Sequence, residues 1–221
     1  MSDQLTINWP YLLFAVAMLW FPRQWLHTGA RVLKKRHKPD GAMERLAGMG
    51  ARDPDDKSVQ AGREFANFRN YLDLFRALAG GYGLSQFAFV AGTEDAELTV
   101  FIGQAVVLLV AALIQSVRYD GRLNFFAPIF YLVGLSVGTS GPATGLFAFA
   151  LVLAINPVIP TPRMFLTAYG LLLLAFGLVF GTDLPLLGVN TVLILLPPVF
   201  SLLVKRPLVI FTRKPKTARS T

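Results

Sequence analysis

The sequence predicts an all-α integral membrane protein with about seven transmembrane helices, one leader helix followed by three helical hairpins. Two observations predict this class. Of the 221 residues, 54% are hydrophobic and only 15% are charged, which is more apolar than a typical soluble domain. The apolar runs are also continuous, as in Ala105–Ile114 and Gly170–Val179, whereas the strands of a membrane β-barrel alternate.

Seven apolar segments are candidates for the transmembrane helices. A helix needs about 20 mostly apolar residues to cross the hydrocarbon layer, and several of these segments are slightly short. Their ends must therefore draw on flanking Tyr, Phe and Pro residues. In chain order the segments are Leu5–Phe21, Leu74–Val90, Leu98–Val117, Leu123–Gly138, Ala143–Ile159, Met164–Phe180 and Leu186–Val204.

The charges of the connecting loops alternate along the chain and predict an orientation. One face carries all 21 Lys and Arg residues. Because cytoplasmic loops are enriched in Lys and Arg, we expect the N-terminus outside and the C-terminus in the cytoplasm. The opposite face carries only carboxylates, namely Asp3, Glu94, Asp95, Glu97 and Asp183.

The first segment, within residues 1–26, is the shortest, because prolines at positions 10 and 22 bracket it. It is still expected to form the first transmembrane helix, since aromatic belts mark both membrane interfaces. All three Trp residues of the chain flank it: Trp9, Trp20 and Trp25.

Residues 27–70 are predicted to form a basic cytoplasmic loop. Arg31–Lys38 is polybasic, and each such cation gains about 1 kcal/mol near an anionic leaflet. Ser58 is expected to cap an amphipathic interfacial helix that continues to Asn70 and into the second segment. Its apolar residues recur at helical spacing, as Ala61, Phe65, Phe68 and Leu72.

Residues 71–204 are predicted to form a six-helix membrane bundle of hairpin repeats. The pattern Gly-Leu-x-x-Gly-Thr-x-x-Pro-x-x-Gly begins at Gly134 and again, 43 residues later, at Gly177. Gly and Thr would end the outgoing helix and Pro would start the return helix. The repeat favours close helix packing more strongly than it favours transport.

Prolines inside two segments mark candidate helix breaks, and each one frees a backbone carbonyl. Interrupted helices form substrate sites in transporters, although structural kinks are more common. The polar residues within the segments, such as Gln104, are neutral, which disfavours ion-coupled transport and indicates hydrogen bonds between helices. The break candidates are Asn156, Pro157, Pro197 and Pro198.

Two cytoplasmic bends hold the densest polar clusters. On a helix, Asp73 can pair with both Arg69 and Arg76. If the bends adjoin, their arginines could bind lipid phosphate and a pair of carboxylates could hold Mg²⁺; ordinary membrane anchors with local ion pairs explain the same residues. The candidates for lipid-phosphate binding are Arg69, Asn70, Tyr71, Asp73, Arg76, Arg118, Tyr119, Asp120 and Arg122.

The residue types needed for most catalytic sites are scarce. The chain has no Cys, and its two His residues, His27 and His37, lie in the basic loop. We find no nucleophile elbow, zinc-protease motif or phosphate loop. We therefore expect no catalytic residue, no metal and no cofactor, and residues 205–221 are expected to form a basic cytoplasmic tail.

These observations favour a non-catalytic polytopic membrane protein, either a subunit or scaffold of a complex or a small passive transporter. The alternative is an enzyme or carrier acting on a phosphate-bearing lipid at the cytoplasmic membrane face. The expected partners are membrane lipids, especially anionic phospholipids, and possible further membrane protein subunits, with no nucleic acid. The expected location is the bacterial cytoplasmic (inner) membrane.

Overall fold

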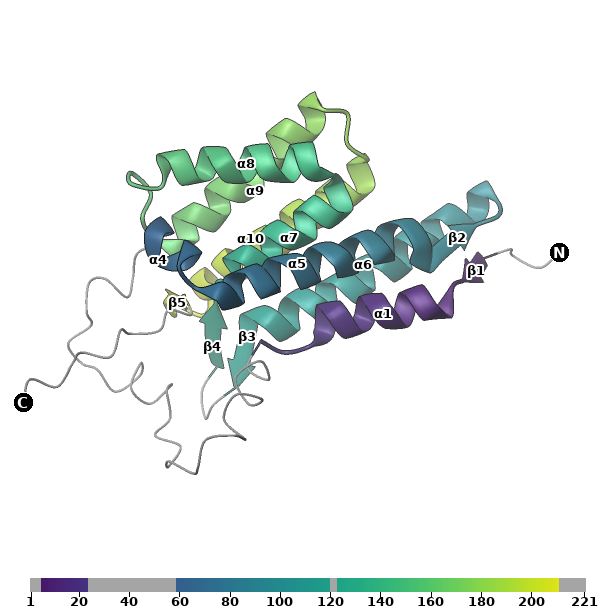
Figure 1. Ribbon diagram of the computed structural model, residues 1–221, viewed down its shortest axis with the longest axis horizontal. Coiled ribbons are helices and arrows are strands. Elements are labelled where there is room, and N and C mark those ends of the chain that lie inside the picture. The colour runs from purple at the N-terminus through teal and green to yellow at the C-terminus, as the bar shows by residue number, and fades with distance from the viewer. Residues whose placement is uncertain (1–4, 24–58, 120–122, 211–221) are drawn as a thin grey trace, which may run out of the picture.

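The computed structural model describes residues 5–23, 59–119 and 123–210, and these residues are mostly helical (Figure 1). The all-α class is therefore confirmed, and each predicted segment contains one principal helix. The helices are α1 (Trp9–Trp20), α4 (Ala61–Phe65), α5 (Phe68–Gly83), α6 (Glu94–Ser116), α7 (Ile129–Ser140), α8 (Pro142–Ile155), α9 (Pro162–Val179) and α10 (Leu184–Leu203). A π-helical turn, Leu84–Ala88, continues α5.

Three of the described helices are long and apolar enough to cross a membrane, in the ranges Ala96–Ser116, Pro162–Val179 and Leu184–Leu203. The shorter apolar helices are α1 and α7, with 12 residues each, and α8, with 14. At 1.5 Å per residue they are only about 18–21 Å long. The structure thus supports association with a membrane.

Short strands join the helices at the two ends of the molecule. The strands β1 (Leu5–Ile7) and β2 (Phe89–Ala91) pair antiparallel. A second sheet has the order β3 (Val117–Tyr119), β4 (Leu123–Phe126) and β5 (Leu208–Val209), with β3–β4 antiparallel and β4–β5 parallel.

The ends of four predicted helical segments are wrong, because they lie in strands: Leu5–Ile7, Phe89–Val90, Val117 and Leu123–Phe126. A proline disfavours helical backbone in the residue before it, and Pro128 directly precedes α7. Pro128 therefore disfavours a helix at Ala127, and Leu123–Phe126 before it pair with β3 and β5 instead.

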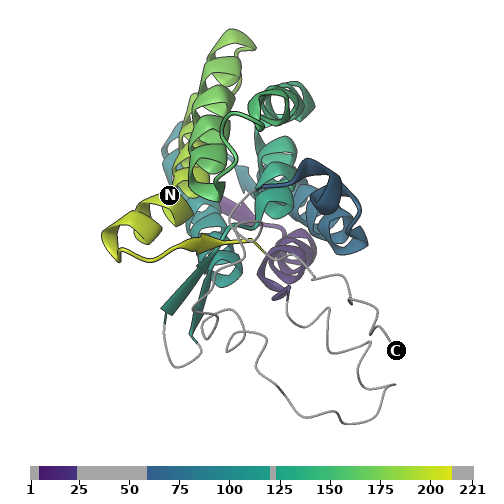
Figure 2. The ribbon, with the colours of Figure 1, turned by 90° about the vertical axis from the view of Figure 1, so that its left-hand side faces the viewer.

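The helices run back and forth between two ends (Figure 1). One end holds β1 and β2, and the other holds α4 and the β3–β5 sheet, which Figure 2 views from that side. Helix α7 lies in the centre and is buried at every position. Its glycines allow close packing on α5, because a Cβ atom at Gly134 would lie 2.1 Å from the carbonyl oxygen of Leu74.

The two copies of the repeated motif turn at different positions. Helix α7 continues through Gly138 to Ser140, and the chain turns at Gly141, where φ is +91°. In the second copy the positive φ, +66°, falls on Gly181, which corresponds to Gly138. The prediction that Gly138 ends a helix is therefore wrong, because this residue packs against α5 instead. The prediction that the prolines begin the return helices is confirmed, with Pro142 opening α8 and Pro185 in the first turn of α10.

The amphipathic helix predicted from Ser58 to Asn70 is interrupted. Helix α4 ends at Phe65, and Asn67 caps a new helix, α5, by accepting a hydrogen bond from the backbone N–H of Arg69. Asparagine is a strong helix N-cap, so the chain restarts a helix there. Ser58, the polybasic run Arg31–Lys38 and the tail beyond residue 210 lie outside the described residues.

Candidate functional site

A buried polar cluster lies where the end of α1 meets α5, α6 and α7. We call it the arginine cluster and define it by five residues: Arg23, Asp73, Arg76, Gln115 and Tyr131. All five are buried, with exposed fractions of 1% for Asp73 and 9% for Arg76. Charged groups are costly to bury without partners, so the contacts of each one decide what the cluster does.

Asp73 lies between two arginine side chains. Its Oδ1 accepts a hydrogen bond from Nε of Arg76 at 2.9 Å, and its Oδ2 lies 3.0 Å from Nε of Arg23. The predicted pairing of Asp73 with Arg76, one helical turn later, is confirmed. Arg23 was missed in the sequence, because it lies 50 positions before Asp73 and its only signal is that it is the first cation after the leader segment.

Arg76 satisfies the backbone at the end of α1. Its Nη1 donates to the carbonyl oxygens of Met18 at 3.1 Å and Phe21 at 2.6 Å, and its Nη2 donates to Oε1 of Gln115 at 3.0 Å. The guanidinium also lies 4.9 Å from the centre of the Tyr131 ring, within cation–π range. The last carbonyls of a helix lack intrahelical partners and carry partial negative charge, so a cation is well placed there.

Helices α6 and α7 contribute further donors to the same turn of α1. Nε2 of Gln115 donates to the carbonyl oxygens of Leu19 at 3.3 Å and Phe21 at 2.9 Å. The Tyr131 hydroxyl donates to the carbonyl oxygen of Leu19 at 3.0 Å. Side chains from three helices thus converge on the C-terminal carbonyls of a fourth, and they hold α1 in place.

Asn70 and Glu64 connect the cluster to α4. Nδ2 of Asn70 donates to Oε2 of Glu64 at 2.7 Å and to the Glu64 carbonyl oxygen at 2.8 Å, and Nη2 of Arg23 donates to Oδ1 of Asn70. Burial raises the pKa of Glu64, opposed by the hydrogen bond from Asn70 and the charge of Arg23. Burial also lowers the pKa of Arg23, opposed by the charges of Asp73 and Glu64.

The structure brings the two predicted polar bends to the same end of the molecule. Strand β3, which carries Arg118 and Tyr119, begins two residues after Gln115, and Gln115 bonds directly to Arg76. Arg69 and Tyr71 are half-buried. Two other candidates, Asp120 and Arg122, lie outside the described residues, and lipid-phosphate binding by the whole set stays a prediction.

The break candidates have different outcomes. Helix α8 ends at Ile155, and Asn156 is its C-cap residue, followed by Pro157. Nδ2 of Asn156 donates to the carbonyl oxygen of Val59 at 2.8 Å, which ties the break to the segment preceding α4. Pro197 and Pro198, by contrast, lie buried inside α10 without ending it.

Arg163 repeats the chemistry of Arg76 at the end of α10. Its Nε donates to Oγ of Ser201 at 2.7 Å, and its Nη2 donates to the carbonyl oxygens of Ser201, in the last turn of α10, at 3.3 Å and of Arg206 at 2.7 Å. Oγ of Ser201 donates to the same Arg206 carbonyl at 2.8 Å. Two arginines at this end of the bundle therefore satisfy the carbonyls at the C-terminal ends of neighbouring helices.

Neutral hydrogen bonds connect the helices at the opposite end, as the sequence predicted for polar residues within the bundle. Nδ2 of Asn190 donates to the hydroxyls of Thr139 and Ser140, both at 2.6 Å. The hydroxyls of Thr144 and Thr182 lie 2.7 Å apart. The Thr144–Thr182 contact joins the two copies of the repeated motif to each other, and Asn190 joins α10 to α7 just beyond the second copy.

Among the described residues, no group of three or more His, Asp or Glu side chains is placed to hold a metal ion. Comparison with known proteins found no matching family model, no matching curated protein and no matching solved structure.

Proposed function

We propose that this chain crosses the membrane seven times, with its N-terminus outside, and acts as a non-catalytic subunit or scaffold of a membrane complex. The proposed orientation, with the C-terminus in the cytoplasm of a bacterial cell, rests on the loop charges. The back-and-forth course of the helices supports the seven crossings. The short helices α1, α7 and α8 span less than the thickness of the bilayer. They can still belong to crossings where other helices, rather than lipid, surround their backbone.

The proposed role rests on the bonding of the arginine cluster, whose charged groups are paired with other protein groups. The three guanidinium nitrogens of Arg76 all bond to protein groups, and both oxygens of Asp73 face arginines. Groups held in this way stabilise helix packing. The hydrogen bonds between Asn190 and the α7 hydroxyls support packing at the opposite end as well.

The outer surfaces of the long helices would contact lipid or partner subunits. Helix α6 exposes a row of apolar side chains at helical spacing, among them Leu98, Ile102, Val106 and Leu109. An apolar face of this kind is suited to hydrocarbon or to another transmembrane helix.

Native mass spectrometry of the full chain, extracted gently from its own membranes, tests the role. We expect a protein partner at a fixed ratio that remains bound when loosely held lipids are removed. Recovery of the chain by itself under conditions that preserve other membrane complexes would contradict the proposal.

Cysteine labelling tests the topology separately, because the chain has no native Cys. In sealed vesicles, an impermeant maleimide should label Glu94→Cys and Lys205→Cys from opposite sides. Labelling of both variants from one side would overturn the proposed threading.

The competing proposal is an enzyme or carrier acting on a phosphate-bearing lipid at the cytoplasmic face, and the closeness of the two polar bends favours it. Asp73 also holds the arginine cluster together, so Asp120→Asn and Arg122→Gln are the cleaner tests. Under this alternative they weaken retention of anionic phospholipid while membrane insertion is unchanged. Under the scaffold proposal they leave the copurified partner unchanged.

A further inference from the structure

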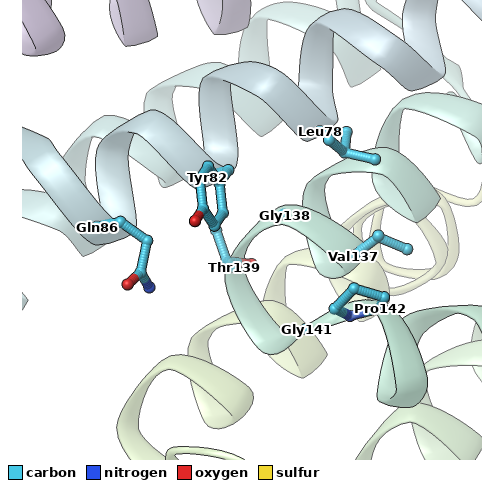
Figure 3. A pocket seen from close by; sticks show the side chains of 8 residues that line it. All are labelled: Leu78, Tyr82, Gln86, Val137, Gly138, Thr139, Gly141 and Pro142. Carbon is cyan, nitrogen blue, oxygen red and sulfur yellow. The ribbon is translucent and has the colours of Figure 1, made fainter.

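A pocket of about 340 Å³ lies toward the end of α5 farthest from the arginine cluster. Its walls are the last turns of α5, the π-helical turn and the α7–α8 connection (Figure 3). Tyr82 and Gln86 reach into it from one side, and Val137, Thr139 and Pro142 line the other. The volume falls within the range of small-molecule sites.

Two backbone features create this space. Gly138 allows α7 to approach α5 closely, since a Cβ atom there would lie 2.4 Å from the Leu78 carbonyl oxygen. Three residues later the chain turns away at Gly141, where an added Cβ would meet nothing within 4 Å. On the facing wall, Gln86 lies in the π-helical turn, a feature that often marks functional sites.

The lining is apolar with a few uncharged polar groups. Leu78, Val137 and Pro142 provide the apolar wall. The Thr139 hydroxyl already donates to the Leu135 carbonyl at 2.8 Å and accepts from Asn190. Among the described residues the Tyr82 hydroxyl has no hydrogen-bond partner, and the Gln86 amide makes only a long bond, 3.4 Å, to Oγ of the adjacent Ser85.

These observations define the chemistry of an occupant. No charged side chain is among the described residues that line the pocket, so a phosphate or carboxylate would lose its hydration without gaining a counter-charge. The pocket is suited to a neutral molecule with an apolar body and one or two hydrogen-bonding oxygens.

We propose that the pocket binds the glycerol ester region of a neutral lipid. Tyrosine prefers the membrane interface, and the ester carbonyls can accept hydrogen bonds from the Tyr82 hydroxyl and the Gln86 amide. An acyl chain would then lie against Leu78 and Val137. The inference rests on the proposed crossing of α5 and α7 but not on the scaffold role, and the cysteine labelling described above tests the crossing independently.

Photocrosslinking of the full chain in phosphatidylcholine vesicles tests this site, with a diacylglycerol bearing a diazirine in its acyl chain as the probe. Peptide mass spectrometry should locate most of the label in residues 78–86 and 137–142. Excess unlabelled diacylglycerol should reduce that label several-fold. A phosphatidylglycerol probe with the same diazirine should label these residues several-fold less.

The double variant Tyr82→Phe, Gln86→Leu removes both polar groups with little change in volume and should also reduce the label several-fold. The matched control is Tyr11→Phe, because Tyr11 does not line the pocket but packs on the Phe87 ring that also contacts Tyr82. Circular dichroism establishes that the variants are folded. Label spread evenly over the lipid-facing side of α6, insensitive to competitor and to the double variant, would overturn the proposal, as would equal labelling by the phosphatidylglycerol probe.

Discussion

Replacing Asp73 with Asn tests whether the arginine cluster holds α1 against the bundle. The substitution keeps the side-chain volume but removes the negative charge that lies 2.9 Å from Arg76 and 3.0 Å from Arg23. Removing one partner of a buried ion pair costs about 3–5 kcal/mol. Arg76 keeps its bonds to the carbonyls of Met18 and Phe21, so we expect the lower end, about 3 kcal/mol, or roughly a 150-fold change in the unfolding constant.

The assay is denaturant unfolding of the purified protein in detergent, followed by tryptophan fluorescence. Trp20 reports on the relevant region, because it lies at the end of α1 and its indole N–H donates to the Val107 carbonyl of α6 at 3.1 Å. The matched control is Asp183→Asn, at the exposed N-cap of α10, where Asn caps about as well as Asp. That control should change the unfolding free energy by less than about 0.5 kcal/mol.

A double-mutant cycle then isolates the ion pair itself. Combining Asp73→Asn with Arg76→Met should cost at least about 1 kcal/mol less than the sum of the two single changes, because residues in one buried network couple. If Asp73→Asn unfolds like the wild type, or if the two changes are additive, the Asp73–Arg76 ion pair does not hold α1 against the bundle.

Three further predictions concern other parts of the bundle. Arg163→Met should lower the unfolding free energy by about 1–3 kcal/mol, since partly buried carbonyls lose a charged donor. Lys205→Met, at an exposed cation, should change it by less than about 0.5 kcal/mol, and denaturant titration measures both. Gly138→Ala should lower the free energy of unfolding by at least about 1–3 kcal/mol, because the added Cβ would overpack against α5. Its control is Gly188→Ala, where an added Cβ meets nothing within 4 Å, and thermal unfolding should find this variant as stable as the wild type or more stable. Burial raises the pKa of Glu64 in the folded protein above its ordinary value of 4.5, so between the unfolded-state and folded-state pKa values the folded protein binds more protons. The free energy of unfolding should therefore fall as pH rises through that interval. Glu64→Gln should flatten this part of the stability curve, and an unchanged pH profile would contradict the raised pKa of Glu64.

The positions of the helices could be predicted from the sequence because they depend on local hydrophobicity. A continuous apolar run is visible in any window of the sequence, and each run contains a helix. The ends of the helices were less predictable. Leu123 and its neighbours are apolar enough for a helix but form a strand, because their backbone pairs with β3 and because Phe125 pairs with Leu208, 83 residues later.

The candidate site was predictable only in its local part. The pairing of Asp73 with Arg76 follows from one helical turn, and the structure contains it. The contacts of Arg23 with Asp73 and of Gln115 with Arg76 join residues 39–50 positions apart. No periodicity in the sequence predicts such contacts, because they depend on how the helices pack in three dimensions.

The short length of α1 gives a physical reason for burying charge beside it. Its 12 residues extend only about 18 Å, so in the proposed threading its last carbonyls would end below the level of the lipid headgroups. Water is scarce at that depth, and each unsatisfied carbonyl there would cost several kcal/mol. Three other helices supply hydrogen-bond donors through Arg76, Gln115 and Tyr131. The negative charge of Asp73 offsets the cost of burying the charge of Arg76. In the proposed threading Arg76, one of the cations from which the orientation is inferred, therefore has a second role, because it completes hydrogen bonds at the end of a helix too short to reach the interface by itself.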